Sequence, residues 1–245
     1  MDERNGGTSK RSLGRGTKVD ITSIAKGWPS SSDAGGLSHK GHKYVLYKIQ
    51  KKDIPKASEV LADAFQYDPL WNRFFEGESH LDLKFRACFE TPIRFCYTFG
   101  EVYATSKNLE GIAAWVPGNL SYMSMWRMIR SGAIFSGMKM GAKAGKKMRP
   151  VFSPLEHDRK ENMRGKPFVY LFIIGVATKL QGQGFGRTLL RALINNCDTS
   201  GNPIYLETEI EHNVKLYENY GFSTIKQITL PIVNHPMWEM VREIR

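Results

Sequence analysis

Three glycines, Gly182, Gly184 and Gly186, stand at alternate positions between an apolar run and an amphipathic stretch. Glycine allows backbone conformations with positive φ, and it lacks the Cβ atom that would block an approaching group. A helix that begins beside such a turn offers unpaired N–H groups and the positive end of its dipole. The pattern therefore predicts a site for a phosphate-bearing ligand. The alternative is a tight strand-to-helix turn that binds nothing.

The spacing of these glycines distinguishes three kinds of phosphate-binding loop. A Walker-A loop, GxxxxGK[ST], needs a lysine that this turn lacks. A Rossmann fingerprint, GxGxxG, does not fit glycines that are two residues apart, although Glu207 lies near the position of a ribose-binding acid. The third pattern, QxxGxG, matches Gln181, Gly184 and Gly186. The sequence favours this third pattern.

The elements that must position the loop follow from hydrophobic patterning. A long apolar strand over 167–178 precedes the loop, a helix over 184–197 follows it, and a helix over 80–99 is interrupted near Pro92. The other predicted elements are strands over 43–49, 101–106, 111–117, 203–208, 222–230 and 236–243, and helices over 53–65, 68–77, 121–148 and 212–220. This order predicts one mixed α/β layer rather than a doubly wound parallel sheet.

The composition limits the class of protein. The 245 residues are 41% hydrophobic, and no stretch approaches the roughly 18 uninterrupted apolar residues of a membrane span. The first residues carry no apolar core of a secretory signal. Cys88, Cys96 and Cys197 form no CxxC pair, which argues against a disulfide framework and against a zinc site. We therefore expect a reduced, cytoplasmic protein without a bound metal.

The net charge of +11 is not spread evenly along the chain. Residues 1–42 are rich in Gly, Ser and Thr and carry an excess of basic residues, and residues 111–155 carry seven Lys/Arg and no acid. The region around the glycines is nearly neutral, so we expect no specific nucleic-acid partner. The sequence predicts a flexible basic N-terminal arm over 1–42 and a single domain over 43–245.

The segments GVATKLQGQGFGRTLL, YLETEIEHNVKLYENYGF and MWEMVRE resemble the GCN5-related N-acetyltransferase (GNAT) family, whose acetyl-CoA loop reads [RQ]xxGx[GA]. The resemblance runs from about Tyr44 to Arg242, and it is closest to the puromycin N-acetyltransferase-like branch. It implies a central twisted, largely antiparallel sheet with one parallel strand pair splayed around acyl-CoA and helices on the flanks. It also implies an enzyme that moves an acetyl group from acetyl-CoA to the amine of a small molecule by direct attack.

The resemblance assigns a cofactor site to the end of the apolar strand and to the loop. The backbone of Ile174, Gly175 and Val176 is expected to hydrogen-bond the pantetheine arm and the thioester carbonyl, which would stabilise the oxyanion that forms there. A plain core strand would not explain a glycine at position 175. The remaining residues expected at the cofactor are Gln181, Gly182, Gln183, Gly184, Phe185, Gly186, Arg187 and Asn213.

The catalytic residues implied by the resemblance are Tyr217 and Glu207. A phenol with an unperturbed pKa of about 10 stays protonated at neutral pH and can protonate the leaving thiolate. Glu207, at the end of the strand beside the cofactor strand, is the expected base, directly or through water. Tyr220 and His212 remain alternatives for the acid and the base. Glu209 is set aside because we assign it to the opposite face of the strand.

The acceptor is expected to contact the segments before and between the early strands. Candidate pocket residues, each of which could equally be an ordinary core residue, are Tyr67, Trp71, Phe74, Phe75 and Trp115. The Met-rich basic segment 121–148 suits a mobile lid, and it also suits contact with an anionic membrane surface or a solvated helical face. A positive cluster beside the pocket would disfavour polycationic acceptors.

Other functions stay open at this point. The chain could be a catalytically silent acyl-CoA-binding module, could acetylate a protein or peptide amine, or could attach to nucleic acid through its tail. The tail carries little aromatic content and its acids dilute its charge, which disfavours the last of these. The sequence does not determine the oligomeric state, and the resemblance leaves a homodimer open because many relatives in the family dimerise.

Overall fold

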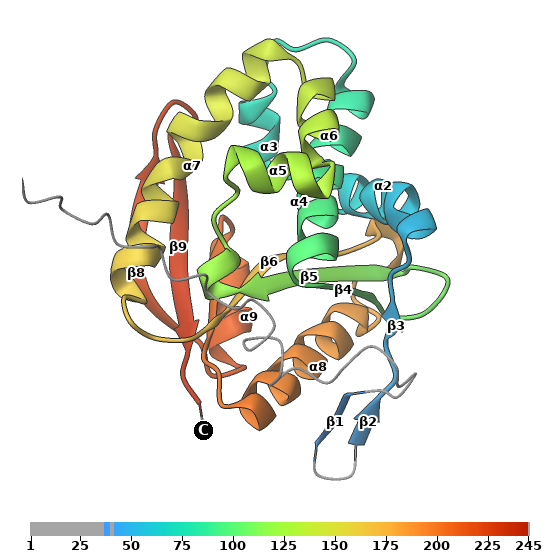
Figure 1. Cartoon of the computed structure of the whole chain (residues 1–245), viewed down its shortest axis with the longest axis vertical. Coiled ribbons are helices and arrows are strands. Elements are labelled where there is room, and N and C mark those ends of the chain that lie inside the picture. Colours follow the sequence, from blue (N-terminus) through green and yellow to red (C-terminus); the bar gives the residue numbers. More distant parts are fainter. Residues whose placement is uncertain (1–36, 40–41, 245) are drawn as a thin grey trace, which may run out of the picture. The chain divides into compact units, whose positions relative to one another are not determined.

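The computed structural model describes residues 37–39 and 42–244 (Figure 1). The strands are β1 (Leu37–His39), β2 (His42–Tyr44), β3 (Tyr47–Lys48), β4 (Glu101–Ala104), β5 (Gly111–Pro117), β6 (Val169–Val176), β7 (Ile204–Thr208), β8 (Ser223–Leu230) and β9 (His235–Arg242). The helices are α2 (Ile54–Ala64), α3 (Pro69–Phe74), α4 (Leu81–Phe99), α5 (Met125–Ser131), α6 (Ala133–Lys139), α7 (Ala142–Asn162), α8 (Phe185–Ser200) and α9 (Glu211–Glu218).

Seven strands form one sheet in the order β3-β4-β5-β6-β7-β9-β8. Every neighbouring pair in this sheet is antiparallel except β6 and β7, which run parallel. The strand β6 is apolar throughout because it lies in the centre, whereas β8 at the edge is mostly exposed. The mixed α/β fold with one parallel pair in a largely antiparallel sheet is therefore confirmed.

Helices cover both faces of the sheet. The helices α2 and α4 pack against β4, β5 and β6, and α8 packs against β5 and β6 from the other side (Figure 1). The helix α7 lies along β8, and α9 contacts β7 and β8. Both strands of the parallel pair are thus held between helices up to the point where they end.

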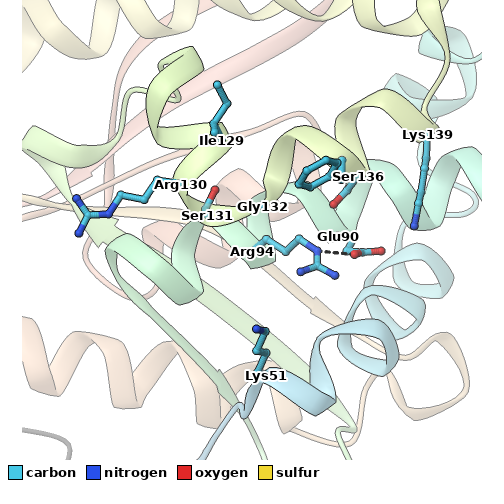
Figure 2. Close-up of a pocket in the computed structure, with 10 residues that line it drawn as sticks. Lys51, Glu90, Arg94, Ile129, Arg130, Ser131, Gly132, Ser136 and Lys139 are labelled. Carbon is cyan, nitrogen blue, oxygen red and sulfur yellow. Dashed lines mark hydrogen bonds and ion pairs between the residues drawn. The ribbon is translucent and has the colours of Figure 1, made fainter.

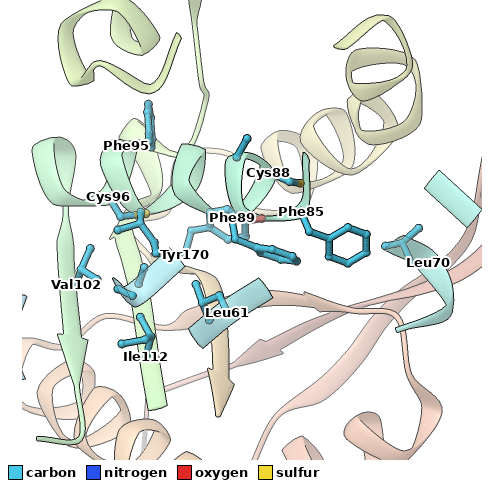
Figure 3. Packing of buried hydrophobic residues seen from close by; sticks show 14 of the residues in the cluster. Leu61, Leu70, Phe85, Cys88, Phe89, Phe95, Cys96, Val102, Ile112 and Tyr170 are labelled. Atoms are coloured by element: carbon cyan, nitrogen blue, oxygen red, sulfur yellow. The ribbon is translucent and has the colours of Figure 1, made fainter. Parts of the chain in front are cut away.

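The core is built from α2, α4 and the centre of the sheet. Large apolar side chains of α4, among them Phe85, Phe89 and Phe95, belong to one buried cluster with Leu61 of α2 and Ile112 of β5, and Phe85 extends toward Leu70 of α3 (Figure 3). The three cysteines are buried and free, as expected from their spacing. Burial in this apolar cluster raises the pKa of the Cys88 and Cys96 thiols well above its ordinary value, so neither is a reactive thiolate.

The helix over 80–99 is not interrupted at Pro92, which corrects the sequence prediction. The helix α4 runs continuously through Pro92. A proline inside a helix removes one hydrogen bond and costs about 3 kcal/mol. The face of α4 that carries Phe89, Ile93 and Cys96 is fully buried, and burial of each such side chain contributes about 1.5–3 kcal/mol. The free energy gained by burying this face therefore outweighs the cost of Pro92 inside the helix.

Two other segments differ from their predictions. The region 121–148 is divided among α5, α6 and the start of α7, because Gly132 and Gly141 adopt positive φ at the breaks. The predicted strand over 43–49 is divided between β2 and β3. The predicted arm over 1–42 lies mostly outside the described residues. Within its last part, β1 pairs with β2 in a short hairpin.

Candidate active site

The strands β6 and β7 pair over a short distance and then separate. Their recorded pairs within the described chain are Val169 with Ile204 and Tyr170 with Tyr205. Beyond these pairs β7 bonds to β9, and β6 keeps only its bonds to β5. A β-bulge in β6 at Phe172 bends the strand at this point. The backbone of β6 from Leu171 to Val176 therefore presents an edge without a strand partner on the side of β7.

Gly175 on this edge has a packing role. A Cβ atom at this position would lie 2.9 Å from Leu61 Cδ2, 3.1 Å from Ala64 Cβ and 3.1 Å from Phe65 Cε2. The glycine thus lets α2 lie directly against β6. Close packing of the helix explains the glycine, which the sequence alone attributed to the approach of a ligand. The expected hydrogen bonding of its backbone remains a prediction.

The glycine loop forms an open turn before α8. Gly182 and Gly184 have φ of +78° and +90°, and no heavy atom lies within 4 Å of the position of a Cβ at either residue. Across the described residues, the N–H groups of Phe185, Gly186 and Arg187 have no recorded acceptor. The first turn of α8 also contains no acidic residue. The loop therefore has the dihedrals, the free donors and the space that an anionic group requires.

The loop is anchored to α2 and β5 rather than free. The N–H of Thr178 donates to Asp63 Oδ2 over 2.6 Å, and its hydroxyl donates to the Asp63 carbonyl over 2.8 Å. The N–H of Ala177 donates to the Glu110 carbonyl over 2.9 Å. Gln181 donates from Nε2 to the Val176 carbonyl over 3.2 Å, whereas Gln183 is exposed. These bonds fix the start of the loop relative to the open edge of β6.

The helix α9 holds Asn213 and Tyr217 on the other side of the gap. Tyr217 is 8% exposed, and its ring contacts Phe222 edge-on at 5.5 Å. In the part of the chain that the structure describes, its hydroxyl has no recorded hydrogen-bond partner, so it is available to a ligand. Burial, and then the charge of Glu209, raise the pKa of Tyr217 above its ordinary value. The phenol is therefore neutral at physiological pH. Asn213 is half-buried.

Glu207 is engaged in a buried ion pair. Its Oε1 accepts a hydrogen bond from Nη1 of Arg159 on α7, and the side chains of the two residues are 7% and 8% exposed. The guanidinium also lies 3.9 Å from the centroid of the Tyr170 ring. Burial by itself would lower the pKa of Arg159. The electrostatic interactions with Tyr170 and Glu207 outweigh burial, so the pKa of Arg159 is raised overall. One oxygen of the predicted base is thus occupied by a permanent cation.

Two further acidic residues, Asp68 and Glu209, lie near this site, and the sequence did not predict a role for them. Asp68 Oδ1 caps α3 by accepting from the N–H groups of Leu70 and Trp71, at 2.9 Å and 3.3 Å. Its Oδ2 is buried and has no donor among the described residues. Burial first, and then the charge of Asp68, raise the pKa of Glu209 well above its ordinary value. The carboxyl of Glu209 therefore lies near that of Asp68 and binds a proton more tightly than an ordinary glutamate.

The prediction that Glu209 lies on the face of the strand opposite Glu207 was wrong. Side chains in a strand alternate with a period of two, so Glu207 and Glu209 belong to the same face and not to opposite faces. The strand β7 ends at Thr208, and the carbonyl of Glu209 is fixed by His235 Nε2 at 3.1 Å. The signal that could have found Glu209 was its position just beyond a strand that borders the ligand crevice. Asp68 was detectable only as a helix cap before Pro69.

The parallel register relates this acid pair to the open edge. Since Tyr170 pairs with Tyr205, four further residues along each strand bring Ile174 and Glu209 to about the same height. The two strands have separated by then, so the backbone at Ile174 and the backbone at Glu209 lie on opposite sides of one gap. The arrangement combines backbone donors, a neutral phenol and a raised-pKa carboxyl, which are the parts needed to transfer an acyl group to an amine.

The aromatic candidates for the acceptor pocket divide into two groups. Phe74, Phe75 and Trp115 are fully buried core residues, with exposed fractions of 0%, 2% and 0%. Trp71 is half-buried next to Asp68, with its ring 5.3 Å from that of Phe89, and Tyr67 is exposed. Only Trp71 therefore combines an aromatic surface with a position beside the acid pair.

The fold and this gap are those that the resemblance to the GNAT family implies, and comparison with known proteins supports this class. A family model described as an acetyltransferase (GNAT) domain matches residues 159–231. An uncharacterized N-acetyltransferase of Schizosaccharomyces pombe is 31% identical over 205 residues, which are 80% of this chain and 82% of that protein. The chain therefore belongs to the GNAT family, and it is an N-acetyltransferase. A position in the puromycin-like branch remains a prediction.

Solved structures share the fold at low sequence identity. A Corynebacterium glutamicum protein described as histone acetyltransferase HPA2 and related acetyltransferase is 22% identical, covers 82% of this chain and 96% of its own, and has a TM-score of 0.56. A putative arylalkylamine N-acetyltransferase 7 from the yellow fever mosquito is 13% identical, covers 80% and 85%, and has a TM-score of 0.58. These similarities concern the fold alone.

Proposed function

We propose that this N-acetyltransferase uses acetyl-CoA to acetylate a small primary amine, and that Glu209, supported by Asp68, receives the proton of the amine. The observation that carries the proposal is the position of this acid pair across the gap from the open edge of β6. A carboxyl group with a raised pKa is a stronger base than an ordinary carboxylate, and it is better matched to an ammonium group.

The residues present fit acetyl-CoA. The open turn at Gly182 and Gly184 and the unpaired N–H groups at the start of α8 suit the pyrophosphate. The free edge of β6 suits the amide groups of the pantetheine arm, which can pair with a strand edge as another strand would. Bound there, acetyl-CoA supplies a thioester carbonyl, and backbone donors of Ile174 to Val176 are candidates to polarise it.

In the proposed reaction, each proton that leaves one group is taken up by a named group or by water. The ammonium group of the acceptor gives one proton to a Glu209 oxygen, and the freed lone pair of the nitrogen attacks the thioester carbon. The C–S bond breaks as the C–N bond forms, and the hydroxyl of Tyr217 gives its proton to the leaving sulfur. The nitrogen then loses its second proton, which restores Tyr217 through solvent, and Glu209 returns its own proton to water. The net result is an amide, a free thiol and one released proton.

The acceptor side favours an amine with an apolar or aromatic body. The carboxylate form of Glu209 attracts an ammonium group, and the half-buried Trp71 next to Asp68 offers an aromatic surface beside it. A fold relative is described as a putative arylalkylamine N-acetyltransferase, which agrees with this class of acceptor. A protein or peptide amine remains the second candidate for the acceptor.

The test measures thiol release from acetyl-CoA with a set of small primary amines, including arylalkylamines and polyamines. Wild type is compared with the matched variants Glu209→Gln and Glu207→Gln. We expect amine-dependent release in which Glu209→Gln lowers kcat/KM about 100-fold or more. The rate of wild type should rise with pH through a step that lies above the ordinary carboxyl range, and Glu209→Gln should abolish this step.

The other outcomes reassign the roles. Full activity in Glu209→Gln together with loss of activity in a stable Glu207→Gln variant would return the base to Glu207. Binding of CoA without thiol release with any amine would favour a silent acyl-CoA-binding module, or an acceptor that is a protein. A peptide with a free N-terminus and a lysine, added to the same assay, separates these two.

A further inference from the structure

The outward faces of α5 and α6 carry an unusual number of large apolar side chains. On α5, Met125, Trp126 and Ile129 are exposed, with Trp126 at 71%. On α6, Phe135 is 68% exposed and Met138 is 71% exposed. We call these five residues the apolar face. A contiguous exposed apolar patch on a soluble domain marks a surface that contacts another molecule.

The two helices differ in how deeply they are packed. The opposite side of α6 is buried, with Ala133 at 0% and Ser136 at 1%, and α6 packs closely against α4. The helix α5 has a defined start, where the side chain of Ser124 accepts from the N–H of Arg127, but none of its residues is fully buried. The exposed apolar side chains of α6 therefore lie opposite its buried face, and α5 is a surface helix.

Basic residues border the apolar face. Arg130 and Lys139 are exposed on the same helices, and no Asp or Glu occurs anywhere between residues 111 and 155. The nearest acid is Glu90 of α4, and it is already paired with Arg94 at 2.5 Å. The surface therefore combines exposed apolar side chains with uncompensated positive charge.

A pocket of about 390 Å³ opens at the edge of this surface. It is lined by the basic residues Lys51, Arg94, Arg130 and Lys139, by the acid Glu90, by Ser136, and by Ile129 and Phe135 of the apolar face. Figure 2 shows Arg94 extending into the space between Lys51 and Ser136, with its guanidinium paired to Glu90. The Ser136 hydroxyl is buried and has no hydrogen-bond partner among the described residues. Because Glu90 balances the charge of Arg94 alone, the pocket keeps an excess of positive charge, and this excess with the Ser136 hydroxyl suits the oxygens of a phosphate group.

We propose that α5 and α6 bind an anionic membrane surface, with the apolar face inserted at the lipid interface and a lipid phosphate held in the pocket. In the part of the chain that the structure describes, no helix is long and apolar enough to cross a bilayer. Short helices with Trp, Phe and Met on one side and Lys and Arg beside them instead lie in the plane of the interface.

The mixture of charge and apolar surface is the reason to choose lipid over other occupants. Anionic lipids attract basic residues at about 1 kcal/mol each, and the apolar side chains gain their free energy from the acyl boundary just below the phosphates. Both kinds of group occur together on this surface, since Ile129 and Phe135 of the apolar face line the same pocket as Lys51 and Lys139. A second copy of the chain would bring the same positive charge and would be repelled.

The test is sedimentation of the full chain with vesicles of phosphatidylcholine alone or with about 30% phosphatidylserine, at low and high salt. We expect binding to the anionic vesicles only, weakened by salt. The variant Trp126→Ser/Phe135→Ser should lower the partition coefficient about tenfold or more. The variant Arg130→Glu/Lys139→Glu should lower it by a similar factor. The matched controls Ile232→Ser, at a residue 61% exposed on the β8–β9 turn, and Arg191→Glu on α8 should bind as wild type.

Acetyl transfer without vesicles, measured on the same variants, separates this proposal from the proposed function, because none of the changed residues belongs to the gap. Absence of sedimentation by a catalytically active protein would overturn the membrane proposal. Equal binding to both kinds of vesicle, or an equal loss in the controls, would also overturn it. Concentration-dependent dimerisation that disappears in Trp126→Ser/Phe135→Ser, without vesicle binding, would assign the face to a homodimer.

Discussion

Arg159 of α7 and Glu207 of β7 form an ion pair in which both side chains are more than nine-tenths buried. The pair joins α7 to β7, the strand that ends at the gap. The guanidinium is further stabilised by the face of Tyr170. Glu207 therefore has a structural role whatever its part in catalysis.

Removal of one partner of this pair should destabilise the protein strongly. The variant Glu207→Gln leaves the Arg159 charge buried and uncompensated, so the free energy of unfolding should fall by about 3–5 kcal/mol. The double variant Arg159→Met/Glu207→Leu should recover most of this loss. Chemical denaturation of the three proteins measures the effect. A stable double variant that retains acetyl transfer would show that Glu207 is not the base.

Tyr217→Phe should separate chemistry from binding. Loss of the hydroxyl removes the proposed proton donor to sulfur, so kcat should fall about 10- to 100-fold, while the affinity for CoA stays near that of wild type. The raised pKa of Tyr217 further predicts that wild type keeps its activity through mildly alkaline pH. Steady-state kinetics and CoA titration provide the measurements, and Tyr220→Phe is the control. An unchanged kcat would exclude the phenol as the acid.

Gly184→Ala should weaken CoA binding. Gly184 has a φ of +90°, which costs an alanine about 1–2 kcal/mol, and the added methyl group would enter the space proposed for the pyrophosphate. We expect the Kd of CoA, measured calorimetrically, to rise about tenfold. Gly145→Ala is the matched control, because Gly145 lies in α7 with an ordinary φ and open space at its Cβ position. This change should stabilise α7 by up to about 1 kcal/mol without an effect on CoA.

Gly175→Ala should disturb the contact between α2 and β6. The new methyl group would lie 2.9 Å from Leu61 Cδ2 and would push the helix away from the strand, at a cost of about 1–3 kcal/mol. Thermal unfolding measures this cost. The second-site change Leu61→Ala, which makes room for the methyl group, should recover part of the activity if the loss comes from displacement of α2. Failure of this rescue would point instead to a direct role of the Gly175 backbone.

The stability of the protein should depend on pH through Glu239. Glu239 is fully buried, accepts a hydrogen bond from Tyr205, and has a pKa raised by burial to about 7. Between its ordinary value of 4.5 and about 7, the folded protein therefore holds a proton that the unfolded chain releases. The free energy of unfolding should fall as pH rises through this window, by about 3 kcal/mol in total.

The variant Glu239→Gln should remove this pH dependence, because an amide cannot ionise. Relative to wild type it should gain stability at pH 8 and little at pH 4. Urea denaturation at several pH values measures both proteins, and the exposed Glu218→Gln serves as the control. Parallel pH profiles for wild type and Glu239→Gln would contradict the assignment.

The sequence predicted the elements that local patterns determine. The strand β5 over 111–117, the glycine loop and the succession of β7, α9, β8 and β9 all follow from periodicity and turn residues within one segment. The proximity of Asp68 and Glu209 could not be predicted from local patterns, because the fold brings these two residues together from distant parts of the chain. The ion pair of Glu207 could not be predicted either, since its partner Arg159 lies between the predicted segments 121–148 and 167–178, where the sequence patterns predicted no element.

The short pairing of β6 with β7 also has a mechanical consequence. Two residue pairs are all that hydrogen-bond these strands to one another in the described chain, so the sheet is least cooperative where the ligand is expected to bind. A molecule that lies along the free edge of β6 and reaches α9 would replace the missing interstrand bonds. Binding in the gap should therefore tie β7 and α9 more firmly to β6, which no other strand pairing does at this end of the described sheet.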